Sequence, residues 1–160
     1  MFETRDENKA EIESILDSGA FIMGRNMFGP IRGAWSGDWR GWWGNNPPYH
    51  APVFVLTHHP REKVTMKGGT TYTFVTDGIE SALEQAKAAA GNRNVAIMGG
   101  AATVNQYLAA GLIDQLRLSI SPLILGRGER LFEGVPEGRL ELVSGRSASL
   151  VQHITYRIIR

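Results

Sequence analysis

Short runs of apolar and β-branched residues, without polar alternation, are the feature that most limits how this chain can fold. Four such runs occupy positions 20–23, 53–57, 72–76 and 95–98, with glycine, proline or polar residues at their ends. Strands that are apolar on both faces are buried on both faces, which is typical of parallel sheets flanked by helices. The sequence therefore predicts an α/β fold in three layers (α/β/α) around a mostly parallel central sheet.

Three helices are predicted from apolar residues three and four positions apart. They run from Thr4 to Gly19 with a Thr4–Glu7 capping box, from Asp77 to Gly91 with an Asp77–Glu80 capping box, and over 101–110 before Gly111.

The last third of the chain predicts strands without helices between them. The segments 116–125, 140–143 and 153–159 are rich in β-forming residues. Neighbouring strands that lack a helical crossover pair in the antiparallel direction. Leu131 and Phe132, after a glycine-rich turn, are predicted to plug into the core.

Length and composition place the chain among ordinary globular proteins. Its 160 residues suit one domain, 1–160. A net charge of +1 gives no electrostatic reason to expect nucleic acid or a membrane as a partner. The absence of cysteine excludes disulfides and thiolate chemistry. With no apolar run of membrane-spanning length and no signal peptide, we expect a cytoplasmic protein.

The strongest local motif is a buried strand that runs through Gly99-Gly100 into a helix, over 95–104. Glycine lets a bulky anion approach the backbone, and the start of a helix offers unpaired amides and a positive dipole end. The motif suits a pyrophosphate, although it is not GxGxxG. A tight strand-to-helix turn without a ligand explains the pattern about equally well.

Two further polar groups follow predicted strands. Arg25 comes directly after the first strand and could form charge-assisted bonds to a phosphate, or it could be a surface arginine. Thr57, His58 and Arg61 follow the second strand and could hold a ribose phosphate. Ligands of open α/β sheets bind beyond the carboxyl ends of the strands, where all three motifs occur. No metal site is predicted, because adjacent histidines on a strand point apart.

The segment 24–52 is rich in glycine, tryptophan and proline, and it is too long for a plain connection. Its aromatic residues can pack a loop or a subunit interface, and this is the favoured interpretation. Alternatively, Trp42 and Tyr49 stack on a flat heterocycle as substrate-binding residues. Asp38, the carboxylate of this loop, is interpreted as a solvated surface residue.

In their order and spacing, the motifs resemble the dihydrofolate reductase superfamily. The resemblance is to the bacterial branch related to the C-terminal reductase domain of riboflavin biosynthesis. It extends from about Ala10 onward, and it rests on Met23-Gly24-Arg25, Val55-Leu56-Thr57-His58, Met98-Gly99-Gly100-Ala101-Ala102, and Pro122-Leu123-Ile124-Leu125-Gly126-Arg127-Gly128 with Leu131-Phe132.

The resemblance implies NADPH as the hydride donor, a cis peptide bond at Gly99–Gly100, and a homodimer. It places one group of residues at the cofactor phosphates, a second at the adenosine ribose and a third at the pyrophosphate. These are respectively Gly24, Arg25, Asn26 and Met27; Thr57 and His58; and Gly99, Gly100, Ala101, Ala102, Thr103 and Val104.

One departure from the resemblance concerns the N-terminus. Members of the superfamily begin with an apolar strand and a loop such as Ser-Leu-Asp-Gly, whereas this sequence enters its first helix almost at once. The missing elements contribute to the nicotinamide and substrate side of the cleft. The acid that polarises dihydrofolate has no counterpart either, so no catalytic residue is assigned.

Two hypotheses follow. The first is an NADPH-dependent reductase of a small flat or ribosylated heterocycle. The second is a non-catalytic module that binds NADPH or another ligand and has lost part of the reductase site; a drug-binding protein that uses the aromatic loop is a weaker variant.

Overall fold

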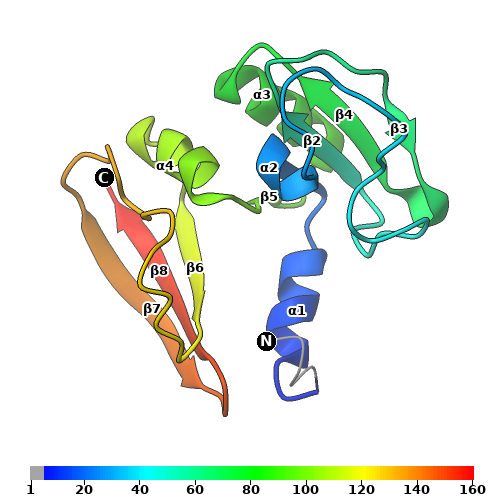
Figure 1. The fold of residues 1–160 in the computed structure, drawn as a ribbon. Helices are drawn as coiled ribbons and strands as arrows, with labels where there is room; N and C mark the ends of the chain where they lie inside the picture. Colours follow the sequence, from blue (N-terminus) through cyan, green and yellow to red (C-terminus); the bar gives the residue numbers. More distant parts are fainter. Residues whose placement is uncertain (1–5) are drawn as a thin grey trace.

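The structure is a computed structural model, and it describes residues 6–160 (Figure 1). Its elements in chain order are α1 (Lys9–Leu16), β1 (Ala20–Gly24), α2 (Arg25–Phe28), β2 (Pro52–Leu56), β3 (Val64–Thr65), η2 (Lys67–Gly69), β4 (Thr71–Val75), α3 (Ile79–Ala90), β5 (Val95–Ile97), α4 (Ala101–Ala109), β6 (Gln115–Ile120), β7 (Arg139–Ser147) and β8 (Gln152–Ile159).

The first sheet contains the four predicted apolar strands. Its order is β3-β4-β2-β1-β5, with β1, β2, β4 and β5 parallel and β3 antiparallel to β4. Every residue of the interior strand β1 is buried, because both faces of the sheet are covered at this strand. The prediction of a mostly parallel sheet with helices on both sides is confirmed.

The second sheet has the order β6-β8-β7 and is antiparallel, as predicted. Strand β6 ends at Ile120, so the β-rich pattern up to 125 overstates its length. Figure 1 shows this sheet standing apart from the first one. The predicted single sheet is therefore divided into two in the described residues.

The core of the first sheet has two parts, one on each face. Ala20 and Ile22 of β1 pack with residues of α3 and α4, among them Leu83 and Tyr107. The other side chains of β1 pack against α2, Leu16 and the aromatic loop. This alternation follows from the strand geometry and produces the predicted three layers.

The predicted helix caps are only partly confirmed. Thr4 lies outside the described residues, and the Glu7 carboxylate accepts hydrogen bonds from Ser149 instead of capping α1. The Asp77 capping box is also wrong, because Gly78 with φ 94° precedes α3. The predicted left-handed end of the first helix at Gly19 is wrong, because α1 ends at Leu16 and Gly19 has no positive φ. Gly91 follows the end of α3, as predicted.

The prediction that Leu131 and Phe132 plug into the core is wrong. Phe132 is 44% exposed and Leu131 is half-buried. The Asn105 side chain of α4 fixes this loop through its backbone: the Phe132 amide donates to Oδ1 (2.8 Å), and Nδ2 donates to the Arg130 carbonyl (2.9 Å). The loop is thus anchored by main-chain hydrogen bonds without burying the phenyl ring.

Candidate functional site

The carboxyl ends of β5, β1 and β2 converge at one edge of the first sheet. The Gly24 amide at the end of β1 donates to the Gly99 carbonyl just beyond β5 (2.8 Å). Nη1 of Arg25 lies 3.5 Å from Oγ1 of Thr57, just beyond β2. The three motifs that follow separate strands in the sequence therefore meet in one place.

The glycine motif leaves its backbone open to approach. The Gly99–Gly100 peptide bond is cis, as the resemblance implied. A Cβ added at Gly99 or Gly100 would meet nothing within 4 Å among the described residues. Helix α4 begins immediately afterwards, and its first amides, before the Thr103 amide donates to the Gly100 carbonyl (3.0 Å), have no intrahelical acceptor. An anionic group can therefore approach this backbone and the positive end of α4.

Gly24 is required by a close approach between β1 and α4. A Cβ at this position would collide with Oγ1 of Thr103, a side chain that is only 7% exposed. The backbone itself is extended, with φ −74°, so the demand for glycine comes from space and not from torsion.

Two arginine side chains meet at Trp35 beside this edge. Cζ of Arg25 lies 3.8 Å from the centre of the Trp35 ring, and Cζ of Arg61 lies 4.9 Å from it. Within residues 6–160, Nε and Nη2 of Arg25 and Nη1 of Arg61 are buried and have no hydrogen-bond partner. Buried donors without acceptors are costly, so the geometry favours a bound anion here.

The pKa shifts of the two arginines also favour a bound anion. Burial lowers the pKa of Arg25, and repulsion from Arg32 lowers it further. Burial also lowers the pKa of Arg61, with repulsion from Arg40 and Arg25 outweighing the attraction of Asp38. Each charged form is therefore under-compensated in this structure, and a phosphate would supply the missing negative charge.

Thr57 and His58 have different environments. Thr57 is 8% exposed, and its hydroxyl accepts from the His59 amide (3.1 Å). The Trp35 indole donates to the His59 carbonyl (2.8 Å), which ties the aromatic loop to the end of β2. His58 is exposed at the edge.

Other residues of the predicted cofactor set lie on the rim or in the core. Asn26 and Ala102 are exposed and Ala101 is half-buried, whereas Met27 and Val104 are half-buried and pack against the core clusters. Met27 and Val104 thus help to build the scaffold through their side chains.

The two predicted substrate-binding aromatic residues do not share a surface. Tyr49 is 6% exposed and packs on Phe21 with ring centres 5.0 Å apart, and its hydroxyl accepts from the Trp43 indole (3.1 Å). This burial makes Tyr49 a core residue and leaves its ring enclosed. Trp42 is 59% exposed and contacts Trp39 edge-on, with ring centres 4.7 Å apart.

The sequence does not single out Trp35, which is one of four tryptophans in a loop. Arg61 is predicted, with Thr57 and His58, to hold a ribose phosphate, but its pairing with Arg25 and Trp35 is not. Their pairing with Arg25 depends on how the loop folds back on the sheet, for which the sequence carries no periodic signal.

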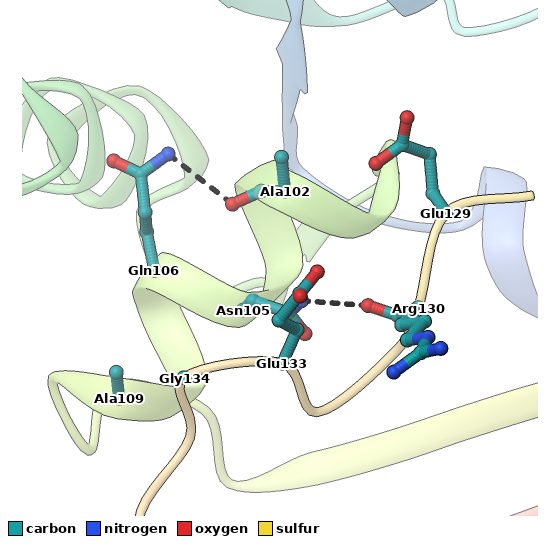
Figure 2. Close-up of a pocket in the computed structure, with 8 residues that line it drawn as sticks. All are labelled: Ala102, Asn105, Gln106, Ala109, Glu129, Arg130, Glu133 and Gly134. Atoms are coloured by element: carbon teal, nitrogen blue, oxygen red, sulfur yellow. Dashed lines mark hydrogen bonds between the residues drawn. The ribbon is translucent and has the colours of Figure 1, made fainter.

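A hollowed surface lies elsewhere, between α4 and the loop 129–134 (Figure 2). It encloses about 360 Å³ and is shallow and open to solvent. Figure 2 shows Asn105 reaching the Arg130 carbonyl across it, so its buried amide is occupied by the loop. It offers no cluster of free donors comparable to the arginine pair.

The strand topology and the site at the strand ends define a dihydrofolate-reductase-like α/β protein. A family model for the RibD C-terminal domain matches residues 4–152. The chain belongs to the RibD C-terminal domain family. No helix within residues 6–160 is long and apolar enough to cross a membrane.

Solved structures share this fold at low sequence identity. A Shewanella protein named for riboflavin biosynthesis has a TM-score of 0.66 at 22% identity, covering 92% of this chain and 78% of that one. A diaminohydroxyphosphoribosylaminopyrimidine deaminase/5-amino-6-(5-phosphoribosylamino)uracil reductase from Thermotoga maritima has a TM-score of 0.64 at 15% identity, covering 98% of this chain and 50% of that one.

One relative is more similar in sequence over a shorter stretch. The uncharacterized protein YyaP of Bacillus subtilis (strain 168) is 34% identical over 77 residues, which is 48% of this chain. The match spans 40% of the length of YyaP.

Proposed function

We propose that the chain is an NADPH-dependent reductase that transfers hydride to a small flat or ribosylated heterocycle. The observation that carries the proposal is the pair of guanidinium groups with buried, unpartnered N–H donors at the ends of β1 and β2. Two under-compensated cations beside a hydroxyl form a receptor for a phosphate monoester, and NADPH differs from NADH by such a group on the adenosine ribose. Membership of the RibD C-terminal domain family supports the same chemistry.

In this proposal, different groups of residues bind different parts of the cofactor. Arg25, Arg61 and Thr57 hold the 2′-phosphate, with His58 on the rim near the ribose. The open Gly99–Gly100 backbone and the start of α4, with Ala101, Ala102 and Thr103, receive the pyrophosphate. The bound cofactor supplies the hydride, and the protein supplies proximity and orientation.

A second candidate function is a module that binds NADPH without turning it over. The observation that favours it is the division of the sheet: within residues 6–160, β5 and β6 each lack a partner on one side. In an open α/β sheet the substrate lies beyond the strand ends. A sheet divided at β5 leaves the substrate side incomplete while the arginine pair stays intact.

Calorimetric titration with NADPH and NADH tests binding, and loss of absorbance at 340 nm tests turnover. We expect NADPH to bind more tightly than NADH, and we expect its oxidation with an amino-(phosphoribosylamino)uracil, the substrate class named for the Thermotoga enzyme. NADPH binding without oxidation of any heterocycle would favour the second candidate. No NADPH binding by the folded chain would contradict both.

We also propose a homodimer, built on the apolar face of the second sheet. This face continues from Leu116, which lies opposite Tyr156, to Leu140 and Leu142, which are 43% and 63% exposed. The adjoining loop adds Leu123 and Ile124, which are 73% and 100% exposed. Apolar patches of this kind on soluble proteins mark interaction sites.

Ile124→Glu is expected to convert such a dimer into a monomer, because it places an uncompensated charge in the interface. Sedimentation velocity measures the change, and Glu129→Gln on the same loop is the matched control that should leave the dimer intact. A wild-type chain that sediments as a monomer at all concentrations would contradict the proposed homodimer.

A further inference from the structure

Both arginines of the candidate site contact the indole ring of Trp35. Cζ of Arg25 lies 3.8 Å from the ring centre, and Cζ of Arg61 lies 4.9 Å from it. At such distances the negative face of an aromatic ring attracts a cation, and tryptophan attracts it most strongly. Within residues 6–160, neither guanidinium forms an ion pair with a carboxylate. The ring therefore supplies an attraction that compensates part of both charges.

Keeping these two cations together has an electrostatic cost. Burial contributes most to the lowered pKa of Arg61, and repulsion from Arg40 and Arg25 lowers it further against the attraction of Asp38. Long cationic side chains normally place their charged ends in water. Two partly buried guanidinium groups that repel each other would therefore be expected to separate unless another group held them. The position of the Trp35 ring allows it to be that group.

Trp35 is itself fixed by its surroundings. Its indole N–H donates to the His59 carbonyl (2.8 Å). Its ring meets Phe28 and Phe74 edge-on, with ring centres 5.9 Å and 5.0 Å apart. Because a tryptophan side chain has only two torsions, one hydrogen bond and two ring contacts are enough to fix the plane of the ring. The ring is thus a rigid support for both arginines.

The two arginines depend on Trp35 to different degrees. Cζ of Arg61 also lies 5.1 Å from the ring centre of Phe74 and 5.9 Å from that of Phe28. Within residues 6–160, Trp35 is the only ring in cation–π contact with Arg25. Loss of the Trp35 ring is therefore expected to release Arg25 more than Arg61.

We propose that Trp35 is a positioning residue that sets the preference for NADPH over NADH. Its ring holds the guanidinium of Arg25 beside that of Arg61 before the nucleotide binds. The 2′-phosphate then meets donors that are already ordered, which reduces the entropic cost of binding. NADH has no 2′-phosphate and does not depend on the ring. The inference rests on the proposed function, because it assigns the arginine pair to this phosphate.

The first test compares two substitutions of Trp35 in the full chain. Trp35→Leu removes the ring, and we expect it to lower the affinity for NADPH by roughly 3- to 30-fold, the range that one cation–π contact covers. The affinity for NADH should change by less than about twofold. Trp35→Phe keeps a ring face but loses the N–H, so it should retain more of the preference for NADPH than Trp35→Leu. Calorimetric titration with each nucleotide measures these affinities.

Trp39→Phe is the matched control. Trp39 lies in the same loop, and its indole also donates to a backbone carbonyl, that of Phe28 (3.0 Å). Within residues 6–160, it makes no cation–π contact with either arginine. Its substitution should leave the ratio of the two affinities unchanged. If Trp35→Leu left this ratio unchanged, or lowered both affinities equally, Trp35 would have only a structural role and the inference would be overturned.

A measurement without nucleotide tests the contact itself. Protons over the face of an aromatic ring resonate upfield, so the Nε–H signal of Arg25 in ¹⁵N-labelled wild-type protein should lie upfield of its position in Trp35→Leu. An unchanged signal would overturn the inference alone, even if the wild-type protein binds NADPH selectively. A wild-type protein that shows the upfield signal but binds no NADPH would contradict the proposed function, and the inference with it.

Discussion

Replacing Arg25 by alanine is expected to lower the affinity for NADPH by roughly 10- to 100-fold, because a hydrogen bond to a charged group contributes about 1.5–3 kcal/mol. The affinity for NADH should stay almost unchanged, since NADH has no 2′-phosphate. The reason lies in Nε and Nη2 of Arg25, which are buried without a protein partner. Calorimetric titration of both nucleotides measures the two affinities.

Arg32→Ala is the matched control for Arg25→Ala. Arg32 is an exposed arginine close enough to repel Arg25, but its guanidinium donates to the carbonyls of Gly29 and Ile31. Removing it deletes one nearby positive charge and leaves the buried donors of Arg25 in place. If Arg25→Ala and Arg32→Ala lowered the affinity for NADPH equally, Arg25 would act through the general positive field and not through a contact with the phosphate. If Arg25→Ala lowered the affinities for NADPH and NADH equally, Arg25 would not bind the 2′-phosphate.

Gly24→Ala is expected to lower the free energy of unfolding by about 1–3 kcal/mol, the usual cost of overpacking a filled site. The added methyl group would collide with Thr103 Oγ1, at the point where the Gly24 amide donates to the Gly99 carbonyl. Because the backbone of Gly24 has φ −74°, alanine adds no torsional strain. Urea unfolding followed by circular dichroism gives the loss.

A double mutant separates the collision from other effects of Gly24→Ala. Thr103→Ala removes the hydroxyl and leaves the residue's Cβ at an ordinary 3.7 Å from the new methyl group. Gly24→Ala combined with Thr103→Ala should therefore recover most of the loss measured against Thr103→Ala alone. Strict additivity of the two substitutions would mean that β1 and α4 do not approach each other at this point.

The parallel sheet could be predicted because its strands carry an unambiguous pattern. Each of β1 and β2 is a short run with no polar alternation, and burial on both faces dictates such a run. The positions of Gly99 and Gly100 could be predicted for a related reason, since a glycine pair between a strand and a helix has few structural explanations.

The helix caps could not be predicted, because capping side chains had other partners. Glu7 is drawn to Ser149, which is distant in sequence, and Asp77 accepts a hydrogen bond from Thr76. Capping spacing is a local signal, and a competing hydrogen bond, from a neighbour or from a residue distant in sequence, overrides it.

The arginine pair was only half predictable. Arg25 and Arg61 each follow a recognisable strand end, but their guanidinium groups come together only after the aromatic loop has placed Trp35 beside both. Long loops have no periodicity from which such contacts can be read. The same limitation applies to Tyr49, whose burial against Phe21 depends on the path of that loop.

The central claim is that three strand ends form one phosphate-binding surface, and amide chemical-shift mapping tests it most directly. NADPH is titrated into uniformly ¹⁵N-labelled protein, and the shift of each backbone amide is followed. The account predicts that the largest shifts fall together at Arg25, at Thr57 and His58, and at Gly99 to Thr103. Shifts concentrated instead around Gln106 and Glu133, or at only one of the three strand ends, would contradict it.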